Sequence, residues 1–146
     1  MDAVDRAQVN EAYRPRILVA EDDPDMRRLL VTVLERFGYR VEGVASGVAL
    51  YDALRRLRSG GEPPALILSD VRMPGLDGVR LVEYVRGWGW TIPVVLITAF
   101  CDDELLDRAW AAGATLVLSK PFPMADLASV VGRLAPRRRR SAPAAD

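Results

Sequence analysis

The 146-residue sequence contains no histidine, and this absence removes several kinds of chemistry. Without an imidazole side chain the protein has no histidine general base, no histidine metal ligand and no histidine that could donate a phosphoryl group. Its single cysteine, Cys101, can form neither an internal disulfide framework nor a thiolate metal cage. Because no basic residue stands beside Cys101 in the sequence, we expect an inert thiol.

Long apolar runs are also missing. No stretch approaches the ~18 consecutive apolar residues that a membrane-spanning helix requires. The opening MDAVDRAQVNEAYRPR carries charges throughout and lacks the apolar centre of a secretory signal. We therefore expect no membrane segment and a location in the reducing cytoplasm.

The formal net charge is zero, with 20 basic and 20 acidic residues, but the charges are unevenly distributed. Residues 136–146 hold Arg137–Arg140 and one acid, which leaves 16 basic and 19 acidic residues in positions 1–135. We expect the arginine run to be solvated rather than bound to nucleic acid or lipid. Residues 1–14 and 136–146 show no periodic apolar pattern and are expected to be flexible, which leaves 15–135 as one compact domain.

Five short apolar runs predict the strands of this domain. Their starts are 22 to 28 residues apart, so each gap has room for a helix and two turns. Four runs are nearly continuous, which is typical of strands covered on both faces, whereas YRVEGV alternates and indicates an edge strand. The runs are RILVA (16–20), YRVEGV (39–44), ALILS (65–69), PVVLIT (93–98) and TLVLS (115–119).

Apolar residues at helical spacing predict a helix after each strand. The first helix follows Asp23-Pro24, ends at Gly38 and presents a single apolar stripe of Met26, Leu29, Leu30, Val33, Leu34 and Phe37. The other helices are expected over residues 48–57, 79–88, 102–112 and 123–134. The order is (βα)₅, and parallel strands joined by right-handed crossovers form a doubly wound α/β sheet.

Polar residues stand where four of the five strands end. The first strand is followed by Glu21, Asp22 and Asp23, and the third ends at Asp70. The fourth delivers Thr98 and the fifth Lys120. Ligands of doubly wound sheets bind beyond the carboxyl ends of the strands, so these groups face one rim. Each has a structural explanation on its own, and helix capping is the one we favour for Asp23 and Asp25, but their joint placement indicates a site.

The motifs ILVAEDD, LILSDVRMPGLDG, VVLITA and LSKPF, in that order and at compatible spacing, resemble the receiver domain of bacterial two-component response regulators. The resemblance covers roughly residues 15–135. It implies a flavodoxin-like, five-stranded sheet with strand order 2-1-3-4-5. In that order the first and third strands are neighbours, so Glu21, Asp22 and Asp70 come together.

Three carboxylates at short range repel one another and raise one another's pKa values. A hard divalent cation relieves this repulsion, and a set of oxygen ligands without His or Cys suits Mg²⁺ or Mn²⁺. The resemblance implies that Asp22 and Asp70 bind the metal directly, that Glu21 acts through water, and that the backbone carbonyl of Arg72 completes the protein ligands.

Asp70 is the expected phosphoacceptor, because a carboxylate oxygen can attack phosphorus beside the metal. Lys120 can pair with one phosphoryl oxygen and Thr98 can donate a hydrogen bond to another. The resemblance implies that the donor is a phosphohistidine of a sensor histidine kinase or histidine phosphotransfer protein. It also implies a cis bond between Lys120 and Pro121.

Three other hypotheses are open at this point. A phosphatase of the haloacid-dehalogenase type has a DxDx(T/V) signature, but Arg27 stands where Thr or Val is needed after Asp23-Pro24-Asp25. A flavodoxin would need phosphate-binding N–H donors where this loop is acidic. A degenerate receiver would act as a binding module without phosphorylation, although the expected site residues are all present.

The resemblance also gives expectations for the lifetime and the output of the signal. The residues two past Asp70 and Thr98 are Arg72 and Phe100, both bulky, which predicts slow self-dephosphorylation. Val117 replaces the aromatic switch residue of many receivers and is too short for that role. Helix 102–112 has two apolar stripes, one of them with Trp110, so part of the second should be exposed and could join strand 115–119 and helix 123–134 in a partner or homodimer surface.

Only about ten residues follow Leu134, too few for a DNA-binding or catalytic domain. We therefore expect output through another protein rather than turnover of an external substrate. The sequence is compatible with a single-domain regulator and with a piece of a longer chain.

Overall fold

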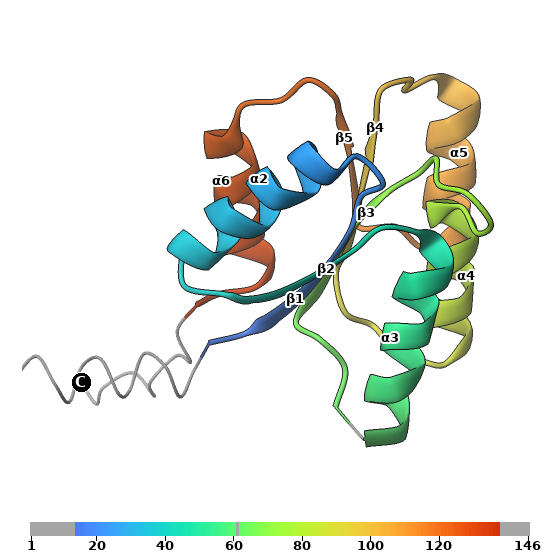
Figure 1. Ribbon diagram of the computed structural model, residues 1–146. Helices are drawn as coiled ribbons and strands as arrows, with labels where there is room; N and C mark the ends of the chain where they lie inside the picture. The colour runs from blue at the N-terminus through green and yellow to red at the C-terminus, as the bar shows by residue number, and fades with distance from the viewer. Residues whose placement is uncertain (1–13, 61, 138–146) are drawn as a thin grey trace, which may run out of the picture.

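The computed structural model describes residues 14–60 and 62–137, so the segments expected to be flexible, 1–14 and 136–146, lie almost wholly outside the described residues. The described chain alternates strand and helix throughout (Figure 1). Its elements are β1 (Arg16–Ala20), α2 (Pro24–Arg36), β2 (Arg40–Val44), α3 (Gly47–Gly60), β3 (Leu66–Asp70), α4 (Gly78–Gly87), β4 (Val94–Thr98), α5 (Asp103–Ala112), β5 (Leu116–Ser119) and α6 (Met124–Leu134).

The five strands form one parallel sheet in the order β2-β1-β3-β4-β5, which confirms the predicted fold class and strand order. Helices α2 and α6 cover one face of the sheet and α3, α4 and α5 cover the other (Figure 1). Two apolar cores result, one on each side. Alternate residues of β1 pack into the two cores, with Ile17 in the α2/α6 core and Leu18 in the α3/α4/α5 core.

Strands β3 and β4 are buried along their whole length and β1 from Ile17 onward, as their continuous apolar runs predict. β2 lies at an edge and is largely exposed or half-buried, which confirms its assignment as an edge strand. β5 is the opposite edge, and its apolar residues are only half-buried. The expectation of a strand fully covered on both faces was therefore wrong for β5, because an edge strand has a neighbour on one side only.

Helix boundaries follow local capping chemistry. Asp23, Asp77 and Asp102 are N-caps, and their carboxylates accept backbone N–H groups in the first turns of α2, α4 and α5. These bonds satisfy N–H groups that have no partner within a helix. The single stripe expected for α2 was only partly right. Leu30 and Leu34 are buried, but Leu29 and Phe37 are 45% and 41% exposed.

Two glycines let the loop after β3 approach its neighbours closely. A Cβ on Gly47 would overlap the backbone carbonyl of Leu76, and one on Gly78 would lie 2.6 Å from the carbonyl oxygen of Asp70. At both positions a larger residue would force the neighbouring backbone to shift. None of the described helices has the length and apolar character needed to cross a bilayer.

Candidate functional site

Glu21, Asp22 and Asp70 meet at the carboxyl ends of β1 and β3. The two strands are direct neighbours in the sheet, with Ala20 level with Ser69. Each of the three carboxylates offers one oxygen, and these oxygens all lie within 4.8 Å of one another. The strand order therefore brings together the acids that the sequence placed at separate strand ends.

Lys120 reaches this acidic group from the end of β5. Its Nζ lies 2.8 Å from Glu21 Oε1 and 2.9 Å from Asp70 Oδ2, and it donates a hydrogen bond to each. The Lys120–Pro121 bond is cis, as expected. One ammonium group thus pairs with two of the three carboxylates.

The three acids differ in their surroundings. Glu21 is 1% exposed, and its other carboxylate oxygen accepts a hydrogen bond from the N–H of Asp23 at 3.1 Å. Asp70 is also buried, and its Oδ1 accepts the N–H of Arg72 at 3.4 Å. Asp22 is exposed, and its carboxylate makes no hydrogen bond or ion pair within the described residues. Asp22 is therefore available to bind a ligand without breaking an existing contact.

The protonation of the site reflects burial and pairing together. Burial raises the pKa of Glu21, and the nearby charge of Asp70 adds to the rise, so that the hydrogen bonds from Lys120 and Asp23 do not cancel it. Burial acts to lower the pKa of Lys120, but its hydrogen bonds to Glu21 and Asp70 dominate and raise it. Lys120 therefore carries a positive charge at neutral pH, whereas the ionised form of Glu21 is disfavoured.

This donor set fits a hard divalent cation. All the side-chain donors are carboxylate oxygens, which Mg²⁺ and Mn²⁺ prefer, and they carry three negative charges against one lysine. Burial, and to a lesser extent the charge of Asp70, raises the pKa of Glu21, and a bound cation would favour the ionised form that this environment disfavours.

Thr98 lies at the same rim, at the end of β4. Its hydroxyl is buried, accepts the N–H of Phe100 at 3.1 Å, and contacts the carbonyl oxygen of Phe100 at 3.3 Å. Its own carbonyl accepts the N–H of Lys120 at 2.7 Å. The backbone therefore ties Thr98 to Lys120, while the Thr98 hydroxyl engages the loop that leads into α5.

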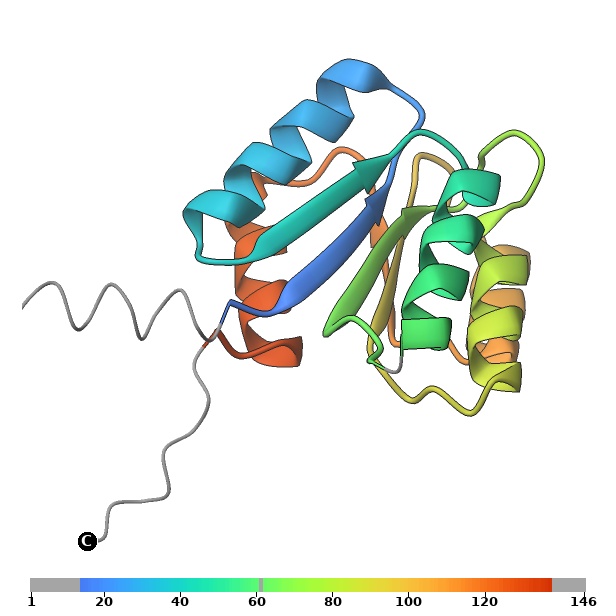
Figure 2. The same cartoon turned by 60° about the horizontal axis from the view of Figure 1, so that its bottom comes forward.

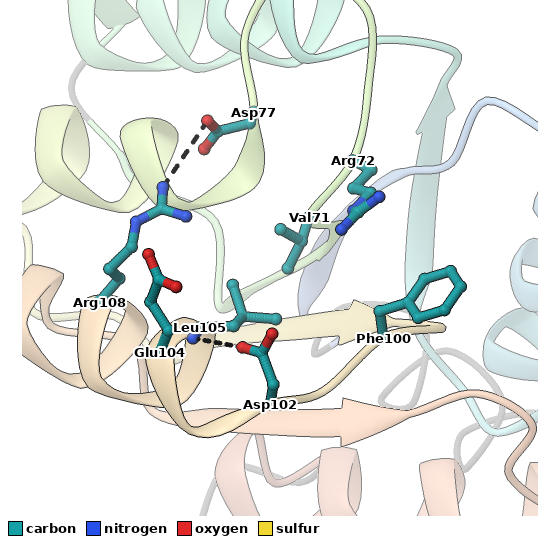
Figure 3. A pocket seen from close by; sticks show the side chains of 8 residues that line it. All are labelled: Val71, Arg72, Asp77, Phe100, Asp102, Glu104, Leu105 and Arg108. Carbon is teal, nitrogen blue, oxygen red and sulfur yellow. Dashed lines mark hydrogen bonds and ion pairs between the residues drawn. The ribbon is translucent and has the colours of Figure 1, made fainter.

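Arg72 and Phe100 meet across the rim, which the sequence did not predict. The guanidinium carbon of Arg72 lies 5.2 Å from the centre of the Phe100 ring, and this cation–π contact joins the loop after β3 to the loop after β4. A pocket of about 340 Å³ opens beside the pair (Figure 3). Farther along it, Arg108 of α5 lies 4.0 Å from Asp77, the N-cap of α4.

A second contact that sequence reasoning missed involves Arg27 of α2. Its Nη1 donates a hydrogen bond of 2.8 Å to the backbone carbonyl oxygen of Glu21. The sequence pointed to Arg27 only as a mismatch with a phosphatase signature. A side-chain contact to a carbonyl six residues back has no sequence signal comparable to helical or strand periodicity.

Comparison with known proteins gives a consistent result. Residues 17–132 match the sequence model of the response regulator receiver domain. The response regulator receiver protein CpdR of Brucella abortus is 37% identical over 119 residues, which cover 82% of this chain and 95% of that protein. The sensor histidine kinase RcsC of Salmonella typhi is 38% identical over 125 residues, which cover 86% of this chain but only 13% of that kinase.

Solved structures agree with the sequence relatives. The signal receiver domain of a histidine kinase from Syntrophus aciditrophicus superimposes with a TM-score of 0.71 at 36% identity, over 90% of this chain and 99% of that domain. A Francisella response regulator receiver domain gives a TM-score of 0.73 at 28% identity, over 86% of this chain and 100% of that domain.

Proposed function

The chain belongs to the family of response regulator receiver domains, and we propose that it accepts a phosphoryl group on Asp70 from a phosphohistidine. The domain would span residues 15–135. The observation that carries the proposal is the contact of Lys120 with both Glu21 and Asp70, next to the free carboxylate of Asp22. This arrangement combines a nucleophile, a cation and a place for a metal within one rim.

Asp70 would supply the attacking oxygen. As the bond from its carboxylate oxygen to phosphorus forms, the bond from phosphorus to the donor imidazole nitrogen breaks, and the electron pair leaves with the imidazole. The product on Asp70 is an acyl phosphate. The buried position of Asp70 and its backbone contact with Arg72 hold the carboxylate in a constant orientation for this attack.

Lys120 and Thr98 would stabilise the transferred group. The Lys120 ammonium already lies at Asp70 Oδ2 and needs only a small shift to pair with a phosphoryl oxygen. The Thr98 hydroxyl would exchange its contact with the Phe100 carbonyl for one with the phosphoryl group. Ala99, with its small side chain, leaves space there and offers a backbone N–H.

The acids Glu21, Asp22 and Asp70, with the carbonyl of Arg72, would hold Mg²⁺ or Mn²⁺. When bound, the cation would offset the negative charge that accumulates as the phosphoryl group approaches Asp70. Asp22 would bind the cation with a free carboxylate. Glu21 would act on it with a carboxylate that also accepts a hydrogen bond from Lys120.

The proposed partner upstream is a sensor histidine kinase or a histidine phosphotransfer protein, because the chain itself contains no histidine. Such donors act in the cytoplasm, which is where we place the protein. Downstream, the proposed surface is formed by α5, β5 and α6, which would bind a protein target or a second copy. Trp110 on α5 is 47% exposed, as the second apolar stripe predicted, and the apolar residues of β5 are half-buried.

Family membership favours a receiver over the phosphatase and flavodoxin hypotheses. Receiver domains are signalling modules, and we propose no turnover of an external substrate. A receiver that works without phosphorylation is the alternative, but the convergence of Lys120 on Glu21 and Asp70 gives it no support.

Phosphoramidate tests the proposal, because its P–N bond has the chemistry of phosphohistidine. After incubation with Mg²⁺, treatment with hydroxylamine should convert the acyl phosphate into a hydroxamate at Asp70, which peptide mass spectrometry locates. A phosphate that resists hydroxylamine, or a hydroxamate at another acid, would contradict it.

A further inference from the structure

Arg27 makes a contact that its charge alone does not explain. Glu21, Asp22, Asp23 and Asp25 all precede it within six residues, yet it forms no ion pair with any acid among the described residues. Its one described side-chain hydrogen bond goes to the carbonyl oxygen of Glu21, at 2.8 Å. That oxygen belongs to the peptide that joins Glu21 to Asp22, the two acids at the end of β1.

The Arg27 side chain passes close to a glycine in the neighbouring strand. Helix α2 lies alongside the edge strand β2 (Figure 2). A Cβ on Gly43 of β2 would lie 3.3 Å from Cγ and 3.5 Å from Cδ of Arg27, and 2.9 Å from Cγ2 of Val31. The stem of Arg27 therefore runs over the open backbone at Gly43 before its head reaches Glu21.

The two acids at the end of β1 need different kinds of support. The carboxylate of Glu21 is held by Lys120 and by the N–H of Asp23, and its own N–H donates to the carbonyl of Val44. The carboxylate of Asp22 has no such partner in the described part of the chain, so its direction depends on the backbone that carries it. Arg27 is bonded to the peptide immediately before Asp22.

From this geometry we propose that Arg27 is a positioning residue for the metal site. It fixes the Glu21–Asp22 peptide and thereby directs the free carboxylate of Asp22 toward Asp70. The inference rests on the metal site of the proposed function. Residues that orient metal ligands from outside the coordination shell affect metal affinity, typically by ten- to a hundredfold.

The charge of Arg27 and its hydrogen bond should have opposite effects on Mg²⁺ affinity, which makes the proposal testable. Arg27 is a cation near a cation site, so removal of its charge alone should tighten Mg²⁺ binding. Loss of its hydrogen bond should loosen the Glu21–Asp22 peptide and weaken Mg²⁺ binding. The sign of the change separates the two effects.

The test compares Arg27→Gln and Arg27→Lys with two controls. Arg28→Gln makes the same charge change one residue along α2, where Arg28 is exposed and forms an ion pair of 3.6 Å with Asp25. Val31→Ala removes packing against Gly43 without touching the acidic loop. For each variant, Mg²⁺ affinity is measured by calorimetry and unfolding by urea. Amide hydrogen exchange at Asp22 and Asp23 is measured in the metal-free protein.

We expect Arg27→Gln to weaken Mg²⁺ binding roughly three- to tenfold, at or below the low end of effects from outside the coordination shell. The Asp23 amide, which donates to Glu21 Oε2, should then exchange faster than in the parent protein. Arg27→Lys, which keeps one donor on a shorter stem, should fall between the parent and Arg27→Gln. Arg28→Gln and Val31→Ala should keep the parent Mg²⁺ affinity, even where urea unfolding shows that Val31→Ala is less stable.

Mg²⁺ binding that is unchanged or tighter in Arg27→Gln would overturn the proposal, as would an Arg27→Lys variant no better than Arg27→Gln. If the parent protein binds no Mg²⁺, the metal site of the proposed function fails. Exchange of the Asp23 amide, which donates to Glu21 Oε2, then decides on Arg27 by itself in the metal-free protein. Faster exchange in Arg27→Gln supports positioning, and unchanged exchange refutes it.

Discussion

Lys120 and Asp70 form an ion pair of 2.9 Å across 50 residues of sequence, and the same ammonium group contacts Glu21 at 2.8 Å. Lys120 therefore compensates two buried carboxylates that would otherwise repel each other. In the proposed reaction the same cation pairs with the phosphoryl group. The contact would thus stabilise the fold before phosphorylation and neutralise charge after it.

Lys120→Met should leave Glu21 and Asp70 without their cation. Removing one partner of a buried pair is strongly destabilising, and the partial exposure of Lys120 reduces the effect, so we expect a loss of about 1–3 kcal/mol in the free energy of unfolding. Mg²⁺ should restore more stability to this variant than to the parent protein. Urea unfolding with and without Mg²⁺ measures both effects. If Lys120→Met and the parent were equally stable in chelator, Lys120 would not compensate the charges of Glu21 and Asp70. Lys120→Arg is the charge-matched control.

The raised pKa of Glu21 predicts how stability depends on pH in the metal-free protein. A folded-state pKa above the unfolded value means that the folded state binds the proton more tightly. The resulting stability is present below the ordinary glutamate pKa of 4.5 and is lost as the pH rises through the folded pKa. Glu21→Gln should therefore be at least as stable as the parent at neutral pH in chelator. Any advantage in the free energy of unfolding should disappear in acid, where Glu21 of the parent is protonated. Urea titrations at several pH values check the sign, and a variant less stable at neutral pH would contradict it.

The contact between Arg72 and Phe100 predicts a long-lived phosphoryl group. Both side chains are bulky, and the ring of Phe100 cannot hold an attacking water by a hydrogen bond. Phe100→Glu should speed the decay of phosphorylated protein, and Arg72→Asn should change it as well. Because the two side chains contact each other, the double variant should deviate from the sum of the single effects. Decay followed by intact mass tests this, and unchanged rates in both single variants would rule the prediction out.

Phosphorylation should alter the surface formed by α5, β5 and α6. Thr98 is bonded to Phe100 in the loop that leads into α5, so movement of its hydroxyl toward a phosphoryl group must disturb that loop. Adding beryllofluoride and Mg²⁺ should shift amide resonances across residues 102–134 as well as those near the acids. Trp110→Ala should retain phosphorylation and weaken any self-association that beryllofluoride induces. Shifts confined to the metal-binding loops would show that this surface is not the output.

Much of the fold could be predicted because it depends on repeated local patterns. Apolar runs located every strand to within about a residue, and parallel topology forces Glu21, Asp70 and Lys120 to one rim. The two failures, in α2 and β5, concern exposure. Leu29 and Phe37 fit the spacing of the buried stripe of α2 but are exposed, and Phe37 lies at the C-terminal end of that helix. β5 has an apolar sequence but an edge position.

The unpredicted part of the site consists of contacts between side chains and distant backbone or rings. Arg27 reaches the carbonyl of Glu21 with its stem close to the backbone of Gly43 in the neighbouring strand. Arg72 meets Phe100 because two loops of different strands lie side by side. Such contacts depend on rotamers and loop paths, which periodicity and residue type do not determine.

Metal-dependent phosphorylation of Asp70 is tested most directly by intact mass after incubation with acetyl phosphate. The parent protein with Mg²⁺ should gain one phosphoryl group. The same incubation with excess chelator, and Asp70→Asn with Mg²⁺, should gain none. Phosphorylation that persists in Asp70→Asn or in chelator, or a parent protein that gains no phosphate with Mg²⁺, would contradict the account.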